Sequence, residues 1–158
     1  MKKSSLSKNE IKELSKIMKS STSVELHVKD FEPVRKFYTK IGFKIIFDTP
    51  GKYLVIRMGN VILNFWGDKN QFPKKQPYFR TWPKKMKSGY GVEIIIPVKD
   101  IKAYYNKIKN TVEIVEELKF QPWQAWDFRI SDPNGFYIRF TEPHDWVFEF
   151  KGYLVDKK

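Results

Sequence analysis

Glu25 and His27 are the residues of this chain whose types and spacing best suit proton transfer. They are two residues apart in an alternating apolar and polar run, so a strand would place both on one face together with Ser23. A histidine beside a carboxylate can act as a general base, because the carboxylate holds its tautomer. The alternative, which we favour, is that both residues line a polar pocket or a dimer seam, since such spacing is common on strands.

Residues 67–88 indicate a different kind of chemistry, because seven lysines and arginines are interleaved there with four aromatic residues. This combination can bind single-stranded nucleic acid through phosphate contacts and base stacking. No RNA-binding signature accompanies it, and three prolines argue against a long helix or a central strand. We favour a linker whose aromatic residues pack onto the domain. The chain also lacks a nucleophile elbow, a Walker loop, a dinucleotide fingerprint and a zinc-protease motif.

The composition is that of one compact domain or of two small half-domains sharing a core. The chain has 158 residues, of which 41% are hydrophobic and 16% aromatic. No apolar run is long enough for a membrane helix, and the absence of cysteine excludes disulfides and thiolate chemistry. The net charge of +12 attracts anions and opposes a strongly cationic ligand. We expect a cytoplasmic protein that does not contact a membrane.

Hydrophobic periodicity predicts a strand, a helix and three further strands within residues 22–66. The alternating run at 23–28 is the first strand, and Asp30 can cap a helix that Gly42 ends at its C′ position. Turn dipeptides at 50–51 and 59–60 then separate three more strands. These strands are predicted at 43–48, 53–58 and 61–66.

Residues 89–142 repeat this order. Val98-Lys99-Asp100 aligns with Val28-Lys29-Asp30 at an offset of 70 residues, and an internal repeat of this kind outweighs any single motif. A strand is predicted at 92–98 and a helix at 101–108, followed by strands at 112–118, 126–130 and 136–140. The remaining segments are a helical extension at 1–21, the linker at 67–88, and a C-terminal extension at 143–158 that is predicted to form one more strand.

Two modules in this order resemble the vicinal oxygen chelate superfamily of glyoxalases, extradiol dioxygenases and bleomycin-resistance proteins. The marks are V-K-D-F…F-Y-x-x-I-G-F at 28–43 and P-W-x-x-W-D-F-x-x-x-D-P-N-G-x-x-I-R-F at 122–140. The motif at 122–140 is most similar to that of the bleomycin-resistance branch, although Gln124 stands where that branch usually has glycine. The resemblance implies an α+β fold, with two tandem βαβββ modules forming a cupped mixed sheet and here an N-terminal helical extension.

In the metal-dependent members of that superfamily, the first and last strands of each module supply one ligand each. The corresponding positions here are Ser23, Asn64, Glu93 and Arg139. Only Glu93 suits a divalent metal, and the guanidinium of Arg139 would repel one because it does not deprotonate. We therefore expect no metal site. We expect Glu93 and Arg139 to lie on neighbouring strands as a bidentate ion pair, which either presents Arg139 to an anionic ligand or is purely structural.

These features favour a small-molecule-binding protein that uses no metal or other cofactor and forms a homodimer, as the resemblance implies. Its ligand would be a neutral or anionic aromatic compound in a concave cavity or a dimer interface. The alternatives are a metal-dependent lyase or dioxygenase with a rearranged site of Glu93, Glu25 and His27, and a nucleic-acid-binding module built on residues 74–87. No catalytic residue is assigned. The residues expected to line the pocket are Ser23, Glu25, His27, Asn64, Trp66, Glu93, Trp123, Trp126, Tyr137 and Arg139.

Overall fold

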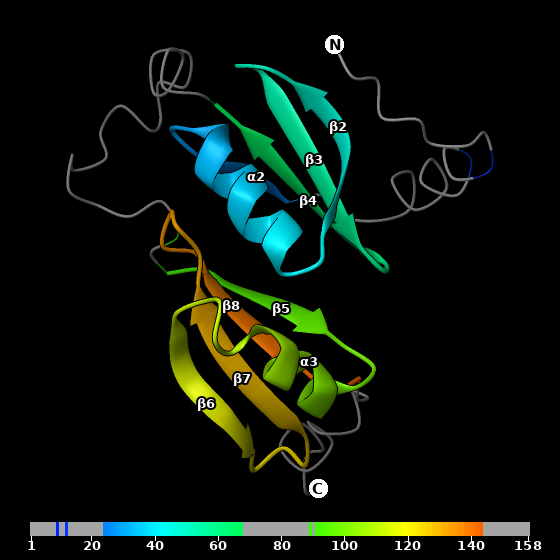
Figure 1. Cartoon of the computed structure of the whole chain (residues 1–158), viewed down its shortest axis with the longest axis vertical. Coiled ribbons are helices and arrows are strands. Elements are labelled where there is room, and N and C mark those ends of the chain that lie inside the picture. The colour runs from blue at the N-terminus through cyan, green and yellow to red at the C-terminus, as the bar shows by residue number, and fades with distance from the viewer. Residues whose placement is uncertain (1–8, 10–11, 13–23, 68–88, 90, 144–158) are drawn as a thin grey trace, which may run out of the picture. The chain divides into compact units, whose positions relative to one another are not determined.

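The protein forms two four-stranded mixed sheets, each accompanied by a helix (Figure 1). The structure is a computed structural model, which describes residues 9, 12, 24–67, 89 and 91–143. The chain divides into two compact units, and each unit carries one of the two predicted modules. The α+β architecture of two tandem βαβββ modules is therefore confirmed.

The first module orders its strands so that the first and last along the chain are neighbours. Its sheet has the order β1-β4-β3-β2, in which β1 is parallel to β4 and the other pairs are antiparallel. Apolar residues alternate along the strands, and those of one face are buried with helix α2. The elements are β1 (Glu25–His27), α2 (Phe31–Lys40), β2 (Lys44–Thr49), β3 (Tyr53–Met58) and β4 (Val61–Trp66).

Helix α2 begins and ends where its sequence predicts. The Asp30 carboxylate accepts a hydrogen bond of 2.9 Å from the Glu32 amide at the first turn. At the other end the Gly42 amide donates to Thr39 O at 3.2 Å, and the Phe43 amide donates to Tyr38 O at 2.9 Å. These two bonds form a Schellman motif, which requires the left-handed backbone that Gly42 adopts at φ 107°.

The other module has the same topology. Its sheet has the order β5-β8-β7-β6, again with the first and last strands parallel. Helix α3 starts at a cap in which Asp100 accepts a 2.9 Å hydrogen bond from the Ala103 amide, and aromatic rings of the helix contact Phe128 and Phe140 of the sheet. The elements are β5 (Glu93–Pro97), α3 (Ile101–Ile108), β6 (Ile114–Phe120), β7 (Trp126–Ser131) and β8 (Tyr137–Thr141).

The outer strands of both sheets are short or irregular. The register shifts between Ile45 and Phe47 in β2, and it shifts twice along β6. Strand β1 has only three residues, and β5 ends at Pro97. Regular pairing is therefore concentrated on the inner strands β3, β4, β7 and β8, which also hold most of the buried strand residues.

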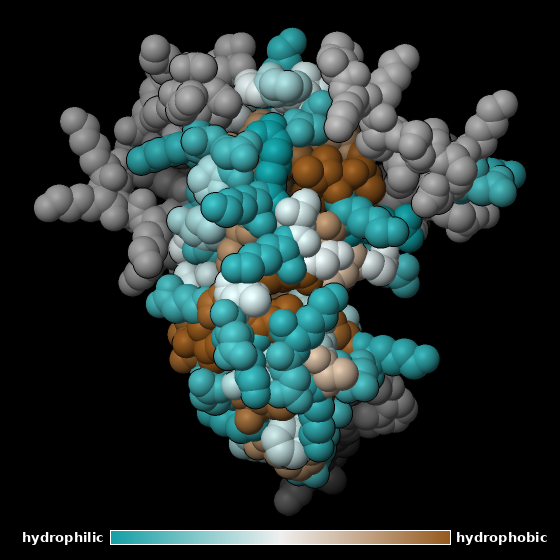
Figure 2. Space-filling view, viewed as in Figure 1, coloured by the Kyte–Doolittle hydropathy of each residue, from teal (hydrophilic) through white to brown (hydrophobic). Residues whose placement is uncertain are grey.

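Several expectations concern residues outside the described part of the chain. Asn9 and Lys12 are helical, but the rest of the predicted extension at 1–21, residues 68–88 and nearly all of 143–158 are not described. Among the described residues, no helix has the length and apolar character needed to cross a bilayer. Polar side chains cover most of the face seen in Figure 2 and are interrupted by apolar patches.

Candidate functional site

Two arginines lie directly opposite each other on neighbouring strands of the β5-β8-β7-β6 sheet. The register pairs Arg129 of β7 with Arg139 of β8, and both side chains project from the face turned away from α3. The alternating residues Phe128 and Phe140 are fully buried on the helix side. Like charges directly opposite each other destabilise a sheet unless neighbouring groups compensate them. We call this surface, formed by Asp127, Arg129, Tyr137 and Arg139, the arginine face.

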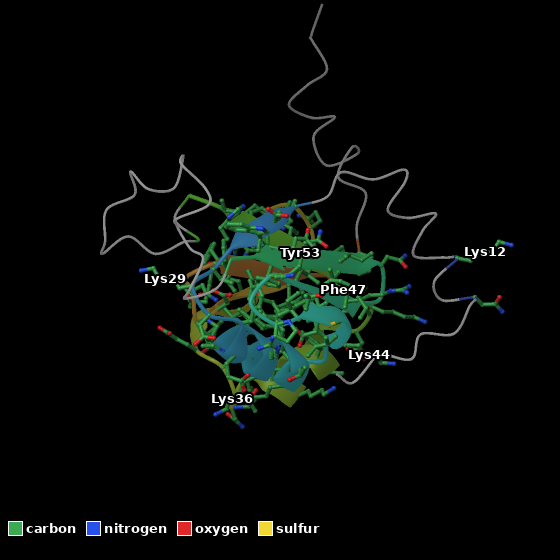
Figure 3. All side chains as sticks on the ribbon, turned by 90° about the horizontal axis from the view of Figure 1, so that it is seen from above. Lys12, Lys29, Lys36, Lys44, Phe47 and Tyr53 are labelled. Carbon is green, nitrogen blue, oxygen red and sulfur yellow. The ribbon has the colours of Figure 1, made fainter. Side chains whose placement is uncertain are left out.

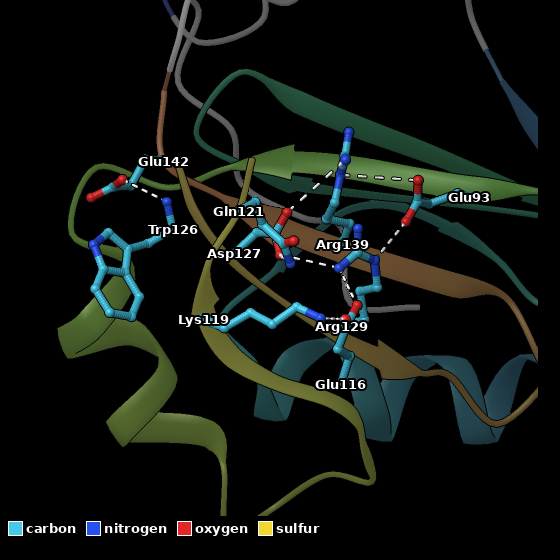
Figure 4. A network of polar contacts seen from close by, with 9 residues as sticks. All are labelled: Glu93, Glu116, Lys119, Gln121, Trp126, Asp127, Arg129, Arg139 and Glu142. Atoms are coloured by element: carbon cyan, nitrogen blue, oxygen red, sulfur yellow. Dashed lines mark hydrogen bonds and ion pairs between the residues drawn. The ribbon is translucent and has the colours of Figure 1, made fainter. Parts of the chain in front are cut away.

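Three carboxylates compensate Arg129. Its Nε donates to Glu93 Oε1 at 3.1 Å and its Nη1 donates to Asp127 Oδ1 at 3.1 Å, while Nη1 also contacts Glu116 (Figure 4). Asp127 is fully buried and also accepts a 2.7 Å hydrogen bond from Gln121 Nε2. Glu116 in turn pairs with Lys119, and this contact, together with Arg129, lowers the pKa of Glu116. Arg129 is therefore the centre of a charge network that includes residues from β5, β6 and β7.

Arg139 joins the same network at longer distances. Its Nε lies 3.9 Å from Glu93 Oε2 and its Nη1 lies 4.0 Å from Asp127 Oδ2. The prediction that Glu93 and Arg139 lie on neighbouring strands is correct, because β5 and β8 are paired. Glu93 and Arg139 form an ion pair, as predicted, but Glu93 also accepts a 3.1 Å hydrogen bond from Arg129 that the sequence did not predict.

Trp123 lies over both guanidinium groups. The centre of its ring is 5.8 Å from Cζ of Arg129 and 5.4 Å from Cζ of Arg139, within the range of cation–π attraction. Its indole Nε1 is buried and has no hydrogen-bond partner among the described residues. Trp123 therefore combines a partly exposed aromatic surface with a donor that the described part of the chain does not use.

Trp126 is the predicted pocket residue that the structure separates from the arginine face. It alternates with Asp127 along β7 and lies on the helix side, where Lys102 Nζ of α3 is 4.3 Å from the centre of its ring. Tyr137 does share the side of Arg139, since the two are two residues apart on β8. Burial is the main cause of the raised pKa of Tyr137.

The described predicted site residues of the first module lie on the paired strands β1 and β4. His27 Nε2 lies 3.1 Å from Glu25 Oε1, and the His27 and Trp66 rings are 5.1 Å apart. Asn64 Nδ2 donates to the Val24 carbonyl at 3.3 Å. Burial lowers the pKa of His27, although the nearby Glu25 acts in the opposite direction. Ser23 lies outside the described residues.

The comparison with protein families identifies the superfamily. The model of the glyoxalase-like domain matches residues 22–145, which span both modules. The chain belongs to the glyoxalase-like family. Its place in the vicinal oxygen chelate superfamily, expected from the motifs at 28–43 and 122–140, is thereby confirmed. No curated protein matches the chain.

Solved structures with the same fold include members of different functional classes. A bleomycin resistance determinant encoded on the transposon Tn5 is 18% identical with a TM-score of 0.60, and the match covers 80% of this chain and 99% of that one. A bleomycin-binding protein complexed with bleomycin is 16% identical, with a TM-score of 0.59 and coverages of 79% and 99%. A lactoylglutathione lyase from Agrobacterium tumefaciens is 15% identical, with a TM-score of 0.57 and coverages of 85% and 98%. At these identities the likeness concerns the fold alone.

The donor set of this glyoxalase-like chain does not fit the metal of the superfamily's metal-dependent members. Among the described positions, Asn64 is a neutral amide, Glu93 is engaged by Arg129, and Arg139 is a permanent cation. No group of three or more His, Cys, Asp or Glu side chains that could hold a metal ion occurs within the described ranges. Divalent metals need several neutral or anionic ligands, so no reaction step is derived through a metal here.

Sequence reasoning missed Asp127, Arg129 and Glu116. The sequence did contain a signal for Asp127 and Arg129. Both alternate with apolar residues in the run 126–130, which places them on the same side of the strand, the side that faces Arg139 in the paired strand. The family motif drew attention to the position of Arg139 only. The role of Glu116 could not be inferred, since irregular pairing along β6 alters the alternation that would assign its side.

Proposed function

We propose that this glyoxalase-like protein binds a planar aromatic compound, neutral or anionic, at the arginine face without using a metal. The observation that carries the proposal is the position of Trp123 over the opposed Arg129 and Arg139. A planar ligand can stack on the exposed part of the indole or on the guanidinium planes. Ligand sites commonly combine apolar or aromatic surface with a few convergent polar groups in this way.

The charge balance of the network supports a neutral or singly negative ligand. Three cations, Arg129, Arg139 and Lys119, face the three carboxylates of Glu93, Glu116 and Asp127, so the cluster is close to neutral. A ligand carboxylate would relieve the repulsion between the opposed arginines and would receive charge-assisted hydrogen bonds. The net charge of +12 favours the approach of such an anion over that of a polycation.

The proposal extends to assembly and location. We propose a cytoplasmic homodimer, as the motifs of the bleomycin-resistance branch imply, with the ligand held in a concave cavity. The solved bleomycin complex belongs to another protein, and the positive charge of this chain argues against bleomycin itself as its ligand. Light scattering coupled to size-exclusion chromatography tests the dimer, and a monomeric mass across the micromolar range would contradict it.

Matched naphthalene probes test the binding site. We expect 2-naphthoate and 2-naphthamide to bind with the anion preferred, as measured by calorimetry. Trp123→Leu should weaken both about five- to tenfold, because it removes the stacking surface. Arg139→Met should remove only the preference for the anion. Trp126→Leu is the matched control, because this tryptophan lies on the opposite side of β7.

The result that would overturn the proposal is equally specific. If Trp126→Leu weakens the probes while Trp123→Leu leaves their affinity unchanged, the arginine face is not the binding site. Circular dichroism and thermal unfolding of each variant establish that its fold is retained, so that a loss of binding is not a loss of structure.

Metal analysis tests the other half of the proposal. We expect purified protein to contain no stoichiometric metal and to show no thermal stabilisation by Zn²⁺, Mn²⁺, Ni²⁺ or Fe²⁺, because Arg139 and the engaged Glu93 do not provide a ligand set. A stoichiometric metal, or a stabilisation of several degrees, would instead favour the lyase or dioxygenase alternative.

A further inference from the structure

Three aromatic side chains form a row across the sheet of the first module. The register places Tyr53 of β3 opposite Trp66 of β4, and it places His27 of β1 beside the same Trp66. The His27 and Trp66 ring centres are 5.1 Å apart. We call these three residues the aromatic row. Residues that directly oppose each other on paired strands project from the same face, so the row is continuous over three strands.

The aromatic row lies on the side of the sheet away from helix α2. The alternating neighbours Leu26 and Phe65 are buried on the other side, where Phe65 contacts Tyr38 of α2. Figure 3 shows Tyr53 on one side of this sheet and Lys36 of α2 on the other. Trp66 and Tyr53 are partly exposed, whereas the His27 side chain is only 11% exposed, so the accessible ring surface of the row comes mainly from Trp66 and Tyr53.

Glu25 places a carboxylate beside the row. Its Oε1 lies 3.1 Å from His27 Nε2, and its interaction with Tyr53 contributes to the raised pKa of that phenol. The side chain of Glu25 remains 38% exposed, so these contacts orient the carboxylate without enclosing it. The basic residue Arg57 lies four positions farther along β3, where its Nε donates to the Gly59 carbonyl at 2.6 Å.

Glu25 is the acidic residue of this cluster, and the pKa values of its two neighbours are shifted. Burial lowers the pKa of His27, only partly offset by Glu25, so the imidazole is neutral at pH 7. Burial, followed by the contact with Glu25, raises the pKa of Tyr53 to about 12, so its hydroxyl stays protonated. The cluster therefore combines aromatic surface with one acidic side chain.

We propose that the aromatic row and Glu25 bind a small organic cation carrying an alkylammonium group. The negative faces of aromatic rings attract such a cation, and tryptophan attracts it most strongly. The adjacent carboxylate adds a direct charge contact at short range. The repulsion from the rest of this basic chain acts over longer distances, and salt screens it beyond about 8 Å at physiological ionic strength.

This proposal uses residues other than those of the proposed function. It uses residues of the first module, whereas the arginine face belongs to the other. It also has the opposite charge preference, because no arginine or lysine is among the groups that form it. Success or failure of either proposal therefore leaves the other open to its own test.

Choline and its neutral isostere 3,3-dimethylbutan-1-ol provide the experiment. They are nearly identical in shape and differ in the charge of the head group. We expect choline to bind and to shift the Trp66 indole N–H resonance, with the alcohol at least about fivefold weaker. Glu25→Gln and Trp66→Leu should each weaken choline by a similar factor, whereas Trp126→Leu should leave its affinity unchanged. Neither Glu25→Gln nor Trp66→Leu should alter the affinity for 2-naphthoate.

Three outcomes with choline itself would overturn the inference, and a fourth follows from the Trp66 variants. These are equal binding of choline and the alcohol, unchanged choline affinity in Glu25→Gln, and shifts confined to tryptophans other than Trp66. Trp66→Phe guards against a folding defect, because it keeps an aromatic ring on the sheet while reducing cation–π attraction. Its affinity for choline should lie between those of the native protein and Trp66→Leu. Equal affinities for the phenylalanine and leucine variants would reject a cation–π site.

Discussion

At the scale of single residues, the opposed arginines differ in what they contribute. Arg129 is 8% exposed and is bound by three carboxylates, so its removal would leave these acids without their common cation. We expect Arg129→Met to lower the free energy of unfolding by about 2–4 kcal/mol. Arg139→Met should change the free energy of unfolding by less than about 1 kcal/mol, because the loss of the Arg139 ion pairs is offset by relief of its repulsion with Arg129. Urea unfolding measures both values.

Arg35 provides the control for this comparison. It forms two 2.8 Å hydrogen bonds with Asp48 in the first module, and its side chain is more exposed than that of Arg129, 24% against 10%. Its replacement by methionine should cost about 1 kcal/mol or less. Equal losses of unfolding free energy in all three variants would mean that the ion pairs of Arg129 stabilise the fold no more than those of Arg139 or Arg35.

The protonation of His27 is another property of single residues. Since burial lowers its pKa in the folded state, unfolding increases its affinity for protons. The unfolded value is about 6.5, so stability should decrease as the pH falls from there through the lowered folded value. NMR titration should show a His27 pKa below 6.5. Glu25→Gln should lower it further, because Glu25 raises it in the native protein.

The other histidine is the control for the pH effect. A His144→Gln variant should retain the loss of stability on acidification, whereas His27→Gln should reduce it in the same interval. A His27 resonance that titrates above 6.5 would show that the contact with Glu25 outweighs burial.

At the scale of elements, the connection between β6 and β7 contains a strained residue. Gln124 has φ 62°, a left-handed conformation that favours glycine, and it is the non-glycine residue with this property among those described. We expect Gln124→Gly to raise the free energy of unfolding by about 0.5–1 kcal/mol, because relief of strain exceeds the added flexibility of the unfolded chain. Gln124→Ala is the control, since it removes the side chain and retains the strain. Thermal unfolding distinguishes the two.

Most helices and strands were predictable because turn residues or helix-capping residues mark the ends of their periodic hydrophobic segments. The strands at 53–58 and 61–66 have the predicted bounds, since turn residues mark their ends, and α3 begins after the predicted cap at Asp100 and spans the predicted apolar stripe. Strand β6 runs from Ile114 to Phe120 rather than over 112–118, because irregular pairing and the connection to Trp126 set its limits. The family motif has glycine at the position of Gln124, so the difference in residue type was visible in the sequence. The left-handed backbone angle of Gln124 was not.

The candidate site was less predictable than the fold for a physical reason. Alternation assigns a side chain to a face, and it correctly placed Arg139 near Glu93. Alternation does not decide which of two adjacent arginines receives a given carboxylate, because that depends on side-chain reach and on competing ion pairs. Arg129 reaches Glu93 from two strands away, in the order β5-β8-β7, and a motif that names only Arg139 cannot anticipate this contact.

At the scale of the whole molecule, the net charge and the local networks act over different distances. The chain carries +12, whereas the cluster around Arg129 is nearly neutral. We expect the affinity for 2-naphthoate to fall several-fold when NaCl is raised from about 50 mM to about 500 mM, since salt screens the long-range attraction between the protein and the anion. The affinity for 2-naphthamide should hardly change. Equal salt effects on the two probes would show that the field of the protein does not assist anion binding.

The duplication also separates two chemistries on one scaffold. Both modules have the same strand order, but the first presents a carboxylate beside aromatic rings and the other presents opposed arginines beneath an indole. Because the residues on the faces away from the helices are not those that pack beneath the helices, each face can change without replacing the residues that contact the helix.

The irregular outer strands have a consequence for the behaviour of the protein in concentrated solution. An outer strand is a template for a neighbouring molecule only where it is long, straight and regular. The shifts in β2 and β6, the brevity of β1 and the proline that ends β5 leave each sheet with poor templates. Growth into amyloid-like fibrils should therefore require prior unfolding, so that resistance to fibrillation follows the stability of the folded modules.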